Sequence, residues 1–506
     1  MVTRVTNRIL INNSLTNIFR LSENMEKTQL RIATGKRVNK LSDDAVRINE
    51  ILSFRSDILQ NTQFIRNINQ SKLLLNTADS AFNDVSLQLQ RAKEIAVSQV
   101  SGTATSTTRT FNAIEVDNLI SQILSSANIQ VENKYVFSGN KVTTTPFSAG
   151  ASGALYFGDR NELSMEIAKD STIGSTIIGS DVFASDMDAG IDSNTLISDL
   201  HKGGGASAGS FTITDRAGNS ATVTITSGMT INNVISAINS ASVNVTASVN
   251  SSNTGISITD TNSNPTGNLT IAESGSGTTA SDLGILGNID GDINGLDLDP
   301  LMTTSTSLSL MKGGNGLTLT DIFISNGSAS GTVSFSSAST IGDVIDSINN
   351  SGLNVTASIN STGNGIVVSS NSSSTAAIVN EVGTGSSASD LGIMGKNNIL
   401  STLLALKEAL EKNDALGIAA TMDNIDSGVE TIALQRGIIG TRVNRLEATE
   451  DIHEQRILDT TENLSDIEDA DFVKEEMDFL AFQNAFNATL NATAQIIQQS
   501  LLDFLR

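Results

Sequence analysis

The stretch that decides the fold is residues 51–96, ILSFRSDILQNTQFIRNINQSKLLLNTADSAFNDVSLQLQRAKEIA. Steps of alternately three and four residues from Ile51 meet an apolar side chain at twelve of fourteen positions. This spacing of about 3.5 residues keeps one seam of an α-helix facing a partner helix along a supercoil. We therefore expect an assembly interface along this seam, formed by Ile51, Phe54, Ile58, Ile65, Ile68, Leu75, Phe82, Val85 and Leu89.

The residues before this seam carry signals for the ends of helices. Ser42 is followed by Asp43 and Asp44, and a hydroxyl cap with two acids suits the positive end of a helix dipole. The long helix is therefore predicted to begin near residue 42. Gly35 is predicted to cap the C-terminal end of an earlier helix, because glycine readily adopts the left-handed conformation found there.

The C-terminal end of the chain carries a matching pattern. Apolar residues recur there every three or four positions, and the interface is expected to include Phe479, Phe482, Phe486, Leu490, Ile497 and Leu501. A narrow seam cannot hide its apolar side chains alone, so such helices need a partner from the same chain or from another copy. The simplest arrangement pairs the N- and C-terminal helices as a coiled-coil bundle. Periodicity leaves an ordinary intramolecular bundle equally open.

The middle of the chain contains an internal repeat. Residues 228–250, GMTINNVISAINSASVNVTASVN, and residues 338–360, ASTIGDVIDSINNSGLNVTASIN, are identical at twelve of 23 positions with an offset of 110. The same offset matches HKGGG at 201 with MKGGN at 311. Each repeat is predicted to form two strands, a short helix capped by Thr230 or Thr340, and further strands with alternating apolar residues.

These patterns predict an α + β multidomain chain, with long paired terminal helices and inserted β-rich domains of ββαββ type. The N-terminal helical region is expected over residues 1–140 and the C-terminal one over 398–506. The β-rich parts between them are expected as a junction domain over 141–200, a first repeat over 201–310 and a second repeat over 311–397.

Composition restricts the chemistry of the chain. It has 506 residues, a net charge of −23, no cysteine and two histidines. The negative charge disfavours binding to nucleic acid or to an anionic membrane. The longest apolar run near the N-terminus is Ile9 to Ile11, too short for a signal peptide. We therefore expect neither nucleic acid nor membrane as a partner, and export from the cell without a cleaved signal peptide.

No group of residues predicts an enzyme, a cofactor or a firm metal site. His453 and Glu454 resemble the start of a zinc-binding H-E-x-x-H, but Ile457 stands at the second ligand position. His453 is therefore expected on a solvated helix face, as is the acidic stretch 466–478. Asp290, Asp292 and Asn294 match the first half of a calcium loop, with Leu301 where a glutamate is needed. Asp297 and Asp299 are possible substitutes, and the alternative, which we favour, is a solvated acidic turn.

Four motifs in order resemble those at the two ends of the flagellin family. They are RIATGKRVNKLSDDA at 31–45, LQRAKEIAV at 89–97, GTRVNRLE at 440–447 and SDIEDAD at 465–471. The residues that carry this resemblance most clearly are Gly35, Arg37, Asp43, Asp44, Gly440, Arg442, Asn444 and Arg445. YVFSG at 135–139, TPF at 145–147 and YFGD at 156–159 resemble the hook–filament junction branch of the family, and the middle repeats resemble its IN-type repeats.

The resemblance implies a structural role outside the cell, in the bacterial flagellum. Members are exported unfolded through the flagellar type III apparatus and pack their terminal helices into an inner tube. The implied partners are further copies in a ring or short helical segment, flagellin, hook-associated protein 1 and a cytoplasmic export chaperone. Two alternatives stay open: a filament flagellin, and a secreted adhesin or carbohydrate-binding protein that uses the repeats.

Overall fold

The computed structural model describes residues 2–40, 42–44, 46–150, 153–263, 267–361 and 363–504. Side chains are described for the same residues except 2–8, 10, 11 and 496–504. Contacts divide the chain into two compact units, Met1–Gln70, Met165–Ile173 and Asn444–Arg506 in the first, and Ser71–Ser164 and Gly174–Val443 in the second. Among the described helices, none has an apolar stretch long enough to cross a membrane.

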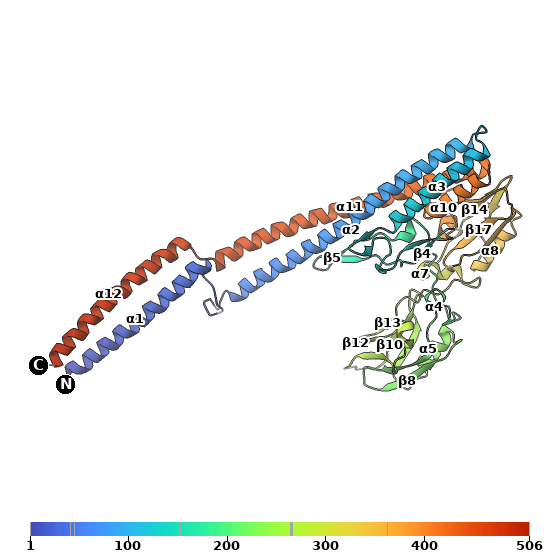
Figure 1. Ribbon diagram of the computed structural model, residues 1–506. Coiled ribbons are helices and arrows are strands. Elements are labelled where there is room, and N and C mark those ends of the chain that lie inside the picture. Colours follow the sequence, from blue (N-terminus) through green and yellow to red (C-terminus); the bar gives the residue numbers. More distant parts are fainter. Residues whose placement is uncertain are drawn as a thin grey trace. The chain divides into compact units, whose positions relative to one another are not determined.

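Four long helices come from the two ends of the chain, as predicted (Figure 1). They are α1 (Val2–Thr34), α2 (Ile48–Val100), α11 (Ala415–Glu468) and α12 (Phe472–Phe504). Helix α1 runs antiparallel to α12, and α2 pairs with α11. In the second unit, Arg436 Nε lies 2.8 Å from Asp79 Oδ1, and Lys93 Nζ lies 2.5 Å from Asp426 Oδ1. The predicted pairing of N- and C-terminal helices is confirmed.

Two shorter helices complete a helical core in the second unit. They are α3 (Ser106–Ala127) and α10 (Ile399–Glu411), which pack along one another. The apolar seam of α2 supplies Leu75, Phe82, Val85 and Leu89, all essentially without exposed surface. Because α3 and α10 add further apolar faces, most of the seam is covered within one chain.

The start of α2 differs from the prediction. The helix begins at Ile48, not near Ser42. The Asp44 carboxylate accepts the Arg47 backbone N–H at 3.2 Å, and the Asp43 carboxylate accepts the N–H groups of Asn39 and Lys40 at 3.0 and 2.8 Å. Asp43 therefore shapes the turn before the helix, whereas Asp44 accepts from an N–H three residues further on, which is the spacing of an N-terminal cap. Gly35 does follow α1 in a left-handed conformation, with φ of +69°.

Short hairpins form the β-rich region that follows α3. Strand β1 (Gln130–Val131) pairs with β2 (Lys134–Tyr135), β3 (Phe147–Gly150) pairs with β4 (Gly153–Tyr156), and β5 (Ser164–Ala168) pairs with β6 (Ser171–Gly174). A single 3₁₀ turn, η1 (Gly179–Asp181), follows. The hairpins β1–β2 and β3–β4 lie in the second unit.

The first repeat folds as two small antiparallel sheets around one helix. The sheet orders are β12-β11-β7-β8 and β13-β10-β9. The elements are α4 (Leu200–Gly203), β7 (Gly209–Thr214), β8 (Ser220–Ile225), α5 (Ile231–Asn239), β9 (Val245–Val249), β10 (Ile256–Asp260), β11 (Leu269–Glu273), α6 (Thr279–Asp282), β12 (Gly287–Ile289) and β13 (Ile293–Asn294). Its core extends from Ile191 to Leu298.

The second repeat has the same plan with fewer strands. Its sheet orders are β15-β14-β18 and β16-β17. The elements are η2 (Leu308–Leu310), α7 (Met311–Gly314), β14 (Ile322–Asn326), β15 (Ala329–Val333), α8 (Ile341–Asn349), β16 (Val355–Ile359), β17 (Ile366–Ser370), β18 (Ala377–Glu381) and α9 (Ser387–Asp390). Thr230 and Thr340 cap α5 and α8 with reciprocal side-chain and backbone hydrogen bonds, as predicted.

One detail of the repeat alignment was wrong. The left-handed residue His201 (φ 53°) corresponds to Lys312 (φ 54°), so the two repeats begin with an offset of 111 residues and not 110. The offset returns to 110 by helices α5 and α8, which begin at Ile231 and Ile341. Between these two points several connecting segments differ in length, and the loop between β7 and β8 is longer than the loop between β14 and β15.

Candidate assembly interface

The predicted interface residues of α2 divide by burial. Ile51, Ile68, Leu75, Phe82, Val85 and Leu89 are buried within their own unit, and Phe54, Ile58 and Ile65 are half-buried. A fully buried side chain has no surface left for a second copy. The half-buried residues lie in the first unit, where α2 has fewer neighbours. Their contact with another copy stays a prediction.

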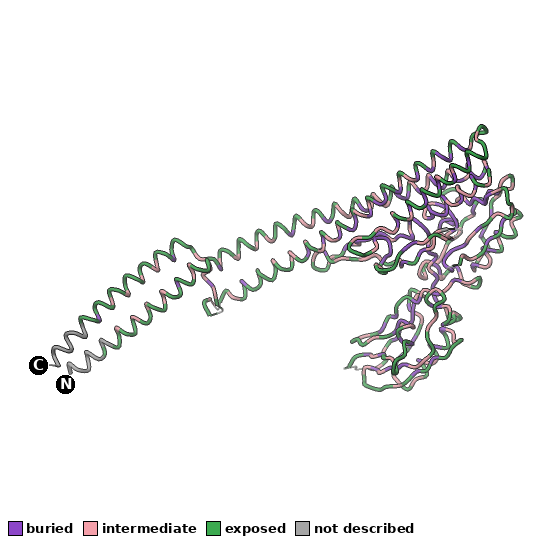
Figure 2. The backbone as a smooth tube through the Cα atoms, in the orientation of Figure 1, coloured by how far each residue is buried: buried purple, intermediate pink, exposed green. Residues whose placement is uncertain are grey.

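Much of the described length of helices α1 and α12 is exposed (Figure 2). Phe479, Phe482 and Phe486 are half-buried and Leu490 is 42% exposed, whereas the side chains of Ile497 and Leu501 lie outside the described residues. Large apolar side chains elsewhere on the pair stand in solvent, with Phe19 71% exposed, together with Val473, Met477 and Leu480. A two-helix pair gives each helix one neighbour, so it covers only one face of each.

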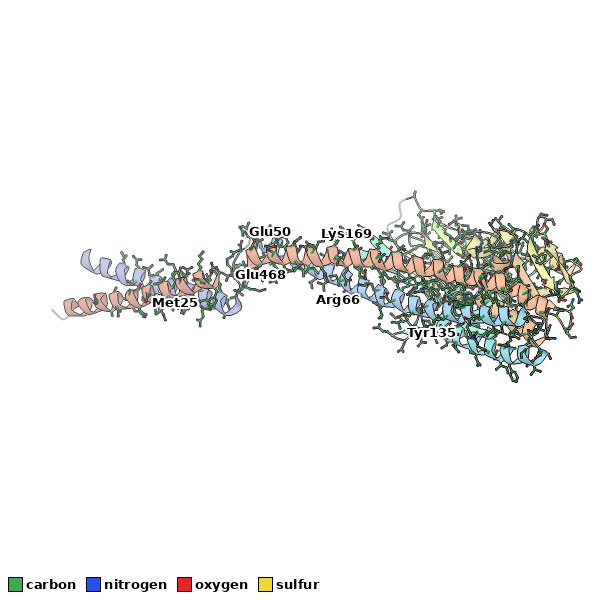
Figure 3. All side chains as sticks on the ribbon, turned by 90° about the horizontal axis from the view of Figure 1, so that it is seen from above. Met25, Glu50, Arg66, Tyr135, Lys169 and Glu468 are labelled. Carbon is green, nitrogen blue, oxygen red and sulfur yellow. The ribbon has the colours of Figure 1, made fainter. Side chains whose placement is uncertain are left out.

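A corner of backbone and ionic contacts holds the two helix pairs of the first unit together. The Arg37 N–H donates to the Glu468 carbonyl at 2.7 Å, and the Ala470 N–H donates to the Gly35 carbonyl at 2.9 Å. The Glu468 carboxylate is 2% exposed and forms ion pairs with Lys36 and Arg55. Figure 3 labels Glu468 at the end of α11.

The prediction that the acidic stretch 466–478 is solvated was therefore wrong for Glu468, and for the buried Glu475, which pairs with Arg31 at 3.3 Å. Burial alone would raise the pKa of Glu468. Hydrogen bonds and charge from Lys36 and Arg55 outweigh burial and hold its pKa below the ordinary value of 4.5. Helical spacing predicted the exposed positions of this stretch but carried no information on the basic loop that covers it.

The N-terminal motif residues build the loop of this corner. Arg37 donates through Nη2 to the Ile467 carbonyl at 2.6 Å and lies 3.3 Å from the Asp44 carboxylate. A backbone hydrogen bond from Lys40 holds the pKa of Asp43 below its ordinary value. The residues that carry the family resemblance thus hold the loop between α1 and α2 against the end of α11.

The C-terminal motif residues hold the β5–β6 region instead. In the second unit, Arg442 donates through Nη1 to the carbonyls of Gly174 and Thr176, and its Nη2 lies 2.9 Å from the Glu162 carboxylate. In the first unit, Arg445 donates to the Ser171 hydroxyl at 3.3 Å. Gly440 and Asn444 are exposed on α11.

His453 is buried, contrary to the prediction of a solvated face. It is 1% exposed, its Nδ1 lies 2.6 Å from Asn61 Oδ1 and its Nε2 lies 2.7 Å from the Ile167 carbonyl. Its ring packs on Phe64 with centroids 5.2 Å apart. The histidine therefore joins α11, α2 and β5. No sequence signal identified the hairpin that covers it.

The junction-type motif residues form an aromatic cluster on α2. Phe82 of the α2 seam lies 5.1 Å from Phe137, and Phe137 and Phe147 lie 5.2 and 5.3 Å from Phe183, between ring centroids. Phe147 in turn packs on Tyr156 at 5.0 Å. These rings attach the β-rich region to the helical core, so the motif has a structural role in this chain.

Gly139 of the same motif lies next to this cluster. Its φ is +68°, and a Cβ there would lie 2.1 Å from Asp159 Oδ1. That carboxylate accepts the N–H groups of Asn140 and Asn161 at 2.9 and 3.0 Å. Any other residue at this position would both strain the backbone and displace Asp159.

The proposed calcium loop does not gather its oxygens. Asp290 is an exposed partner of Arg216, Asp292 accepts the Asp260 N–H at 3.1 Å, and Asn294 lies in β13. Calcium needs six to eight converging oxygens. Among the described residues, carboxylate oxygens converge instead at Asp188, Asp297 and Asp299, within 4.8 Å of one another. Calcium binding at Asp290 stays an untested prediction without geometric support.

Family comparisons agree with this architecture. The bacterial flagellin N-terminal helical region matches residues 5–142, the bacterial flagellin C-terminal helical region matches 422–505, and the flagellin hook IN motif matches 321–372. The chain belongs to the flagellin family. This flagellin-family protein is therefore a structural component of the extracellular flagellum rather than an enzyme, as its sequence predicted.

Curated relatives include both flagellins and hook-associated proteins. Flagellin of Clostridium tyrobutyricum is 30% identical over 139 residues, 27% of this chain and 37% of that protein. Flagellar hook-associated protein 3 of Salmonella typhimurium is 24% identical over 36% of this chain and 57% of its own length. The Escherichia coli protein of the same name is 29% identical over 23% of this chain and 38% of its own length. The matches thus span between about a third and just over half of these relatives.

Solved structures with partial similarity are also known. Flagellar hook associated protein-3 of Legionella pneumophila is 15% identical, covering 83% of this chain and 98% of that one, with a TM-score of 0.39. FlgL of Xanthomonas campestris is 14% identical, covering 81% and 98%, with a TM-score of 0.37.

Proposed function

We propose that this flagellin-family protein is the junction protein between the hook and the filament of a bacterial flagellum. The observation that carries the proposal is the exposed apolar surface of α1 and α12, on which residues such as Phe19 and Val473 have no cover from the chain itself. Burying apolar surface contributes roughly 25 cal/mol per Å², so repeating such a contact around a ring stabilises it strongly. Neighbouring copies are the proposed cover.

The junction role, as opposed to a general role in the filament, is supported by the aromatic motif at residues 135–159. This motif resembles the junction branch of the family, and two of the relatives named above are hook-associated proteins. In this proposal the chain forms a ring or short helical segment. Hook-associated protein 1 contacts one side of it and flagellin the other.

An export chaperone is the proposed partner before assembly. Exposed apolar helices in the cytoplasm would associate prematurely, because large uncovered apolar patches promote aggregation. A chaperone that covers α12 would keep the chain monomeric and unfolded enough for type III export. Purified chain mixed with the chaperone should lose its tendency to polymerise.

The decisive experiment is a deletion strain inspected by electron microscopy. A junction protein predicts hooks without filaments, with monomeric flagellin released into the medium. The same strain carrying the gene on a plasmid is the control and should regain filaments. Filaments of normal length on the deletion strain would contradict the proposal.

A filament flagellin is the second candidate, favoured by the match to flagellin of Clostridium tyrobutyricum. Copy number separates the two, because a filament contains flagellin in great excess over any junction protein. Quantitative mass spectrometry of isolated flagella should find this chain in a small fixed ratio to hooks. A chain that dominates the filament would favour the alternative.

A carbohydrate-binding role of the repeats is the third candidate and is tested separately. A glycan array probed with the full chain would detect it. A strain that lacks the chain but retains full adhesion would exclude it.

A further inference from the structure

The first repeat joins the rest of its unit through a neck, which we define as residues 186–190 and 297–301. The two segments are equivalent under the offset of 111 residues. One begins Asp186-Met-Asp188 and the other Asp297-Leu-Asp299. The Asp188 N–H donates to Asp186 Oδ1 at 3.0 Å, and the Asp299 N–H donates to Asp297 Oδ1 at 2.9 Å, so both segments make the same turn.

The segment that leaves the first repeat binds the left-handed turn of that repeat. The His201 N–H donates to the Leu298 carbonyl at 2.7 Å, and the Lys202 N–H donates to the Asp299 carbonyl at 2.6 Å. Asp299 itself has a φ of 41°. This segment then continues into the second repeat.

The segment that enters the first repeat makes the equivalent contacts with the second one. The Lys312 N–H donates to the Met187 carbonyl at 2.8 Å, and the Gly313 N–H donates to the Asp188 carbonyl at 2.9 Å. Asp188 has a φ of 45°, matching Asp299. Each neck segment thus binds the turn of one repeat and leads into the other, and the two segments cross.

Four carboxylates meet at this crossing, and two lysines pair with them. Oxygens of Asp188, Asp297 and Asp299 lie within 4.8 Å of one another. Lys202 Nζ lies 3.0 Å from the buried Asp186, and Lys141 Nζ lies 2.8 Å from Asp299. The equivalent of Lys202 in the second repeat is Gly313, so the crossing carries more negative than positive charge.

Burial and the surrounding charges shift the pKa values of two carboxyls at the crossing, those of Asp188 and Asp297. Burial raises the pKa of Asp188 to about 7, with Asp186, Asp297 and Asp299 adding to the rise and Arg160 opposing it. Burial and the charges of Asp299 and Asp186 raise the pKa of Asp297 to about 6, whereas the backbone hydrogen bond from Asp299 and the charge of Lys141 lower it. The charged groups that face the two shifted carboxyls are therefore Asp186, Asp299, Lys141, Lys202 and Arg160.

We propose that the neck is a proton-sensitive hinge, in which protonation of the crossed carboxylates fixes the first repeat on its unit and deprotonation loosens it. The protonated crossing removes repulsion between like charges and lets a carboxyl O–H donate to a neighbouring carboxylate. The hinge is independent of the junction role proposed above, because it lies wholly within the second unit.

The direction of the pH effect follows from linkage. A carboxyl whose folded pKa lies above its unfolded value of 3.8 binds its proton more tightly in the closed neck. The closed neck is therefore favoured at low pH and loses that stability as the pH rises through about 6 to 7.

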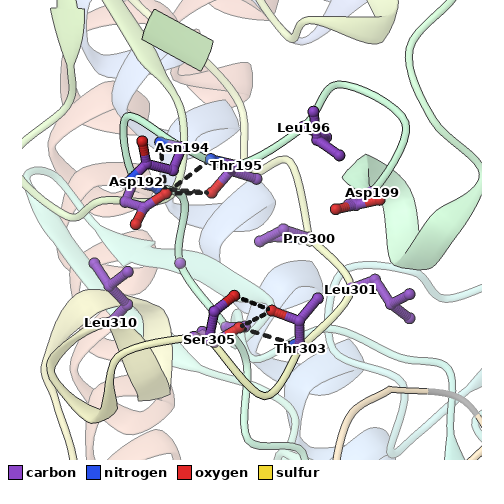
Figure 4. A pocket seen from close by; sticks show the side chains of 13 residues that line it. Asp192, Asn194, Thr195, Leu196, Asp199, Pro300, Leu301, Thr303, Ser305 and Leu310 are labelled. Atoms are coloured by element: carbon purple, nitrogen blue, oxygen red, sulfur yellow. Dashed lines mark hydrogen bonds between the residues drawn. The ribbon is translucent and has the colours of Figure 1, made fainter. Parts of the chain in front are cut away.

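A cavity beside the neck would change with it (Figure 4). Its volume is about 320 Å³, and its lining includes Ala189, Gly190, Pro300 and Leu301 of the neck. Figure 4 shows loops from both repeats facing this cavity, with Asp192 accepting hydrogen bonds from Asn194 and Thr195 on one side and Thr303 bonded to Ser305 on the other. Movement at the neck separates these two sides.

The test measures the distance between the repeats in the full chain as a function of pH. Ser227→Cys and Ser337→Cys place labels at equivalent exposed turns, and the chain has no other cysteine. Distances by double electron–electron resonance, with a chelator present, should form a narrow distribution at about pH 5 and a broad one at about pH 8. An equal width at both pH values would overturn the proposal.

Two variants sharpen the result. Asp188→Asn with Asp297→Asn removes the two titratable carboxyls and should give the narrow distribution at both pH values. Asparagine tolerates the positive φ at position 188. Lys202→Met removes a countercharge, so the ionised carboxylates repel one another more strongly. The change from the narrow to the broad distance distribution should therefore occur at a lower pH than in the wild type. A control that removes two exposed charges elsewhere, Asp84→Asn with Asp346→Asn, should behave as wild type. Two results would refute the hinge. One is a wild-type pH response in the variant that carries both Asp188→Asn and Asp297→Asn. The other is a distance distribution at about pH 8 that is narrower in Lys202→Met than in the wild type.

Discussion

The helical core of the second unit and the α1–α12 pair of the first unit have similar apolar seams. They differ in how much of the seam other helices of the same chain cover. In the core, α3 and α10 add faces to α2 and α11, and Phe82 has no exposed surface. In the pair each helix has one neighbour, and Leu490 of the α12 seam is 42% exposed. The same three-and-four spacing therefore produces a closed core in one region and an open surface in the other.

An apolar seam therefore predicts which side chains will be buried. It does not predict whether the same chain or a second copy covers them. That depends on how many helices the chain itself brings to the seam. In the core, the helices of one chain are enough to cover the seam. For α1 and α12 they are not, and we therefore place the assembly contacts on these two helices.

The largest expected effect is on the core. Phe82→Ala removes a fully buried ring that contacts Phe137 and Phe183, and a cavity of this kind costs about 3–5 kcal/mol of unfolding free energy. Urea unfolding followed by circular dichroism measures the loss. The matched control is Phe111→Ala on α3, where the ring is 67% exposed and the change should stay within about 0.5 kcal/mol. Equal losses at both positions would break the comparison.

The second effect is on assembly. Phe486→Asp places an unpaired charge in the α12 seam, where burial against a neighbouring copy would cost several kcal/mol, at about 1.4 kcal/mol per tenfold in affinity. The variant should not polymerise, while its main thermal transition stays at the wild-type temperature. Asn487→Asp introduces the same side chain at an exposed neighbouring position and should polymerise normally. Polymers of Phe486→Asp would contradict the proposed interface.

A smaller effect is expected at the corner between the two helix pairs. Glu468→Gln weakens the ion pairs with Lys36 and Arg55, and because both bases are more than a third exposed the cost is only about 1 kcal/mol. Hydrogen exchange in residues 35–40 should quicken about fivefold, while Glu462→Gln on the exposed side of α11 should leave it unchanged.

Acid should reproduce this change in the wild type. The folded pKa of Glu468 lies below its ordinary value of 4.5, so its contribution is present above that value and fades as the pH falls through the folded pKa. Protection factors, which are the exchange rates corrected for their intrinsic pH dependence, should therefore fall in the same residues of the wild type as the pH drops below 4.5, and should change less in Glu468→Gln. A larger acid response in the variant would count against this corner.

The smallest effect concerns helix caps. Thr105→Ala removes the capping box of α3 in the core and should lower the unfolding free energy of the second unit by about 1 kcal/mol. Asp471, whose carboxylate accepts the Lys474 N–H at 3.1 Å, has the same role for α12. Asp471→Ala should fray α12 locally without moving the main transition, measured by exchange and by calorimetry. A shift of the main transition by Asp471→Ala would show that the pair unfolds with the core.

Much of the architecture could be predicted because local patterns determine it. The seam from Ile51, the Thr230 and Thr340 caps and the left-handed Gly35 each depend on a few neighbouring residues, and each has the predicted conformation. The start of α2 was missed because Asp43 and Asp44 serve a turn whose shape depends on Arg37 and on the end of α11.

What the pattern of residues settled is the set of elements: long helices at both ends, two related β-rich repeats and side chains that must be buried. Helical period and strand alternation are properties of short segments, so they can be deduced without a partner. Tertiary structure alone decided that His453 and Glu468 are buried, that α2 finds its cover within the chain and α1 does not, and that two acidic segments 111 residues apart cross at one neck. All of these features depend on contacts between segments that are far apart in the sequence. Those contacts determine which side chains are buried, which charges are paired and which carboxyls have shifted pKa values.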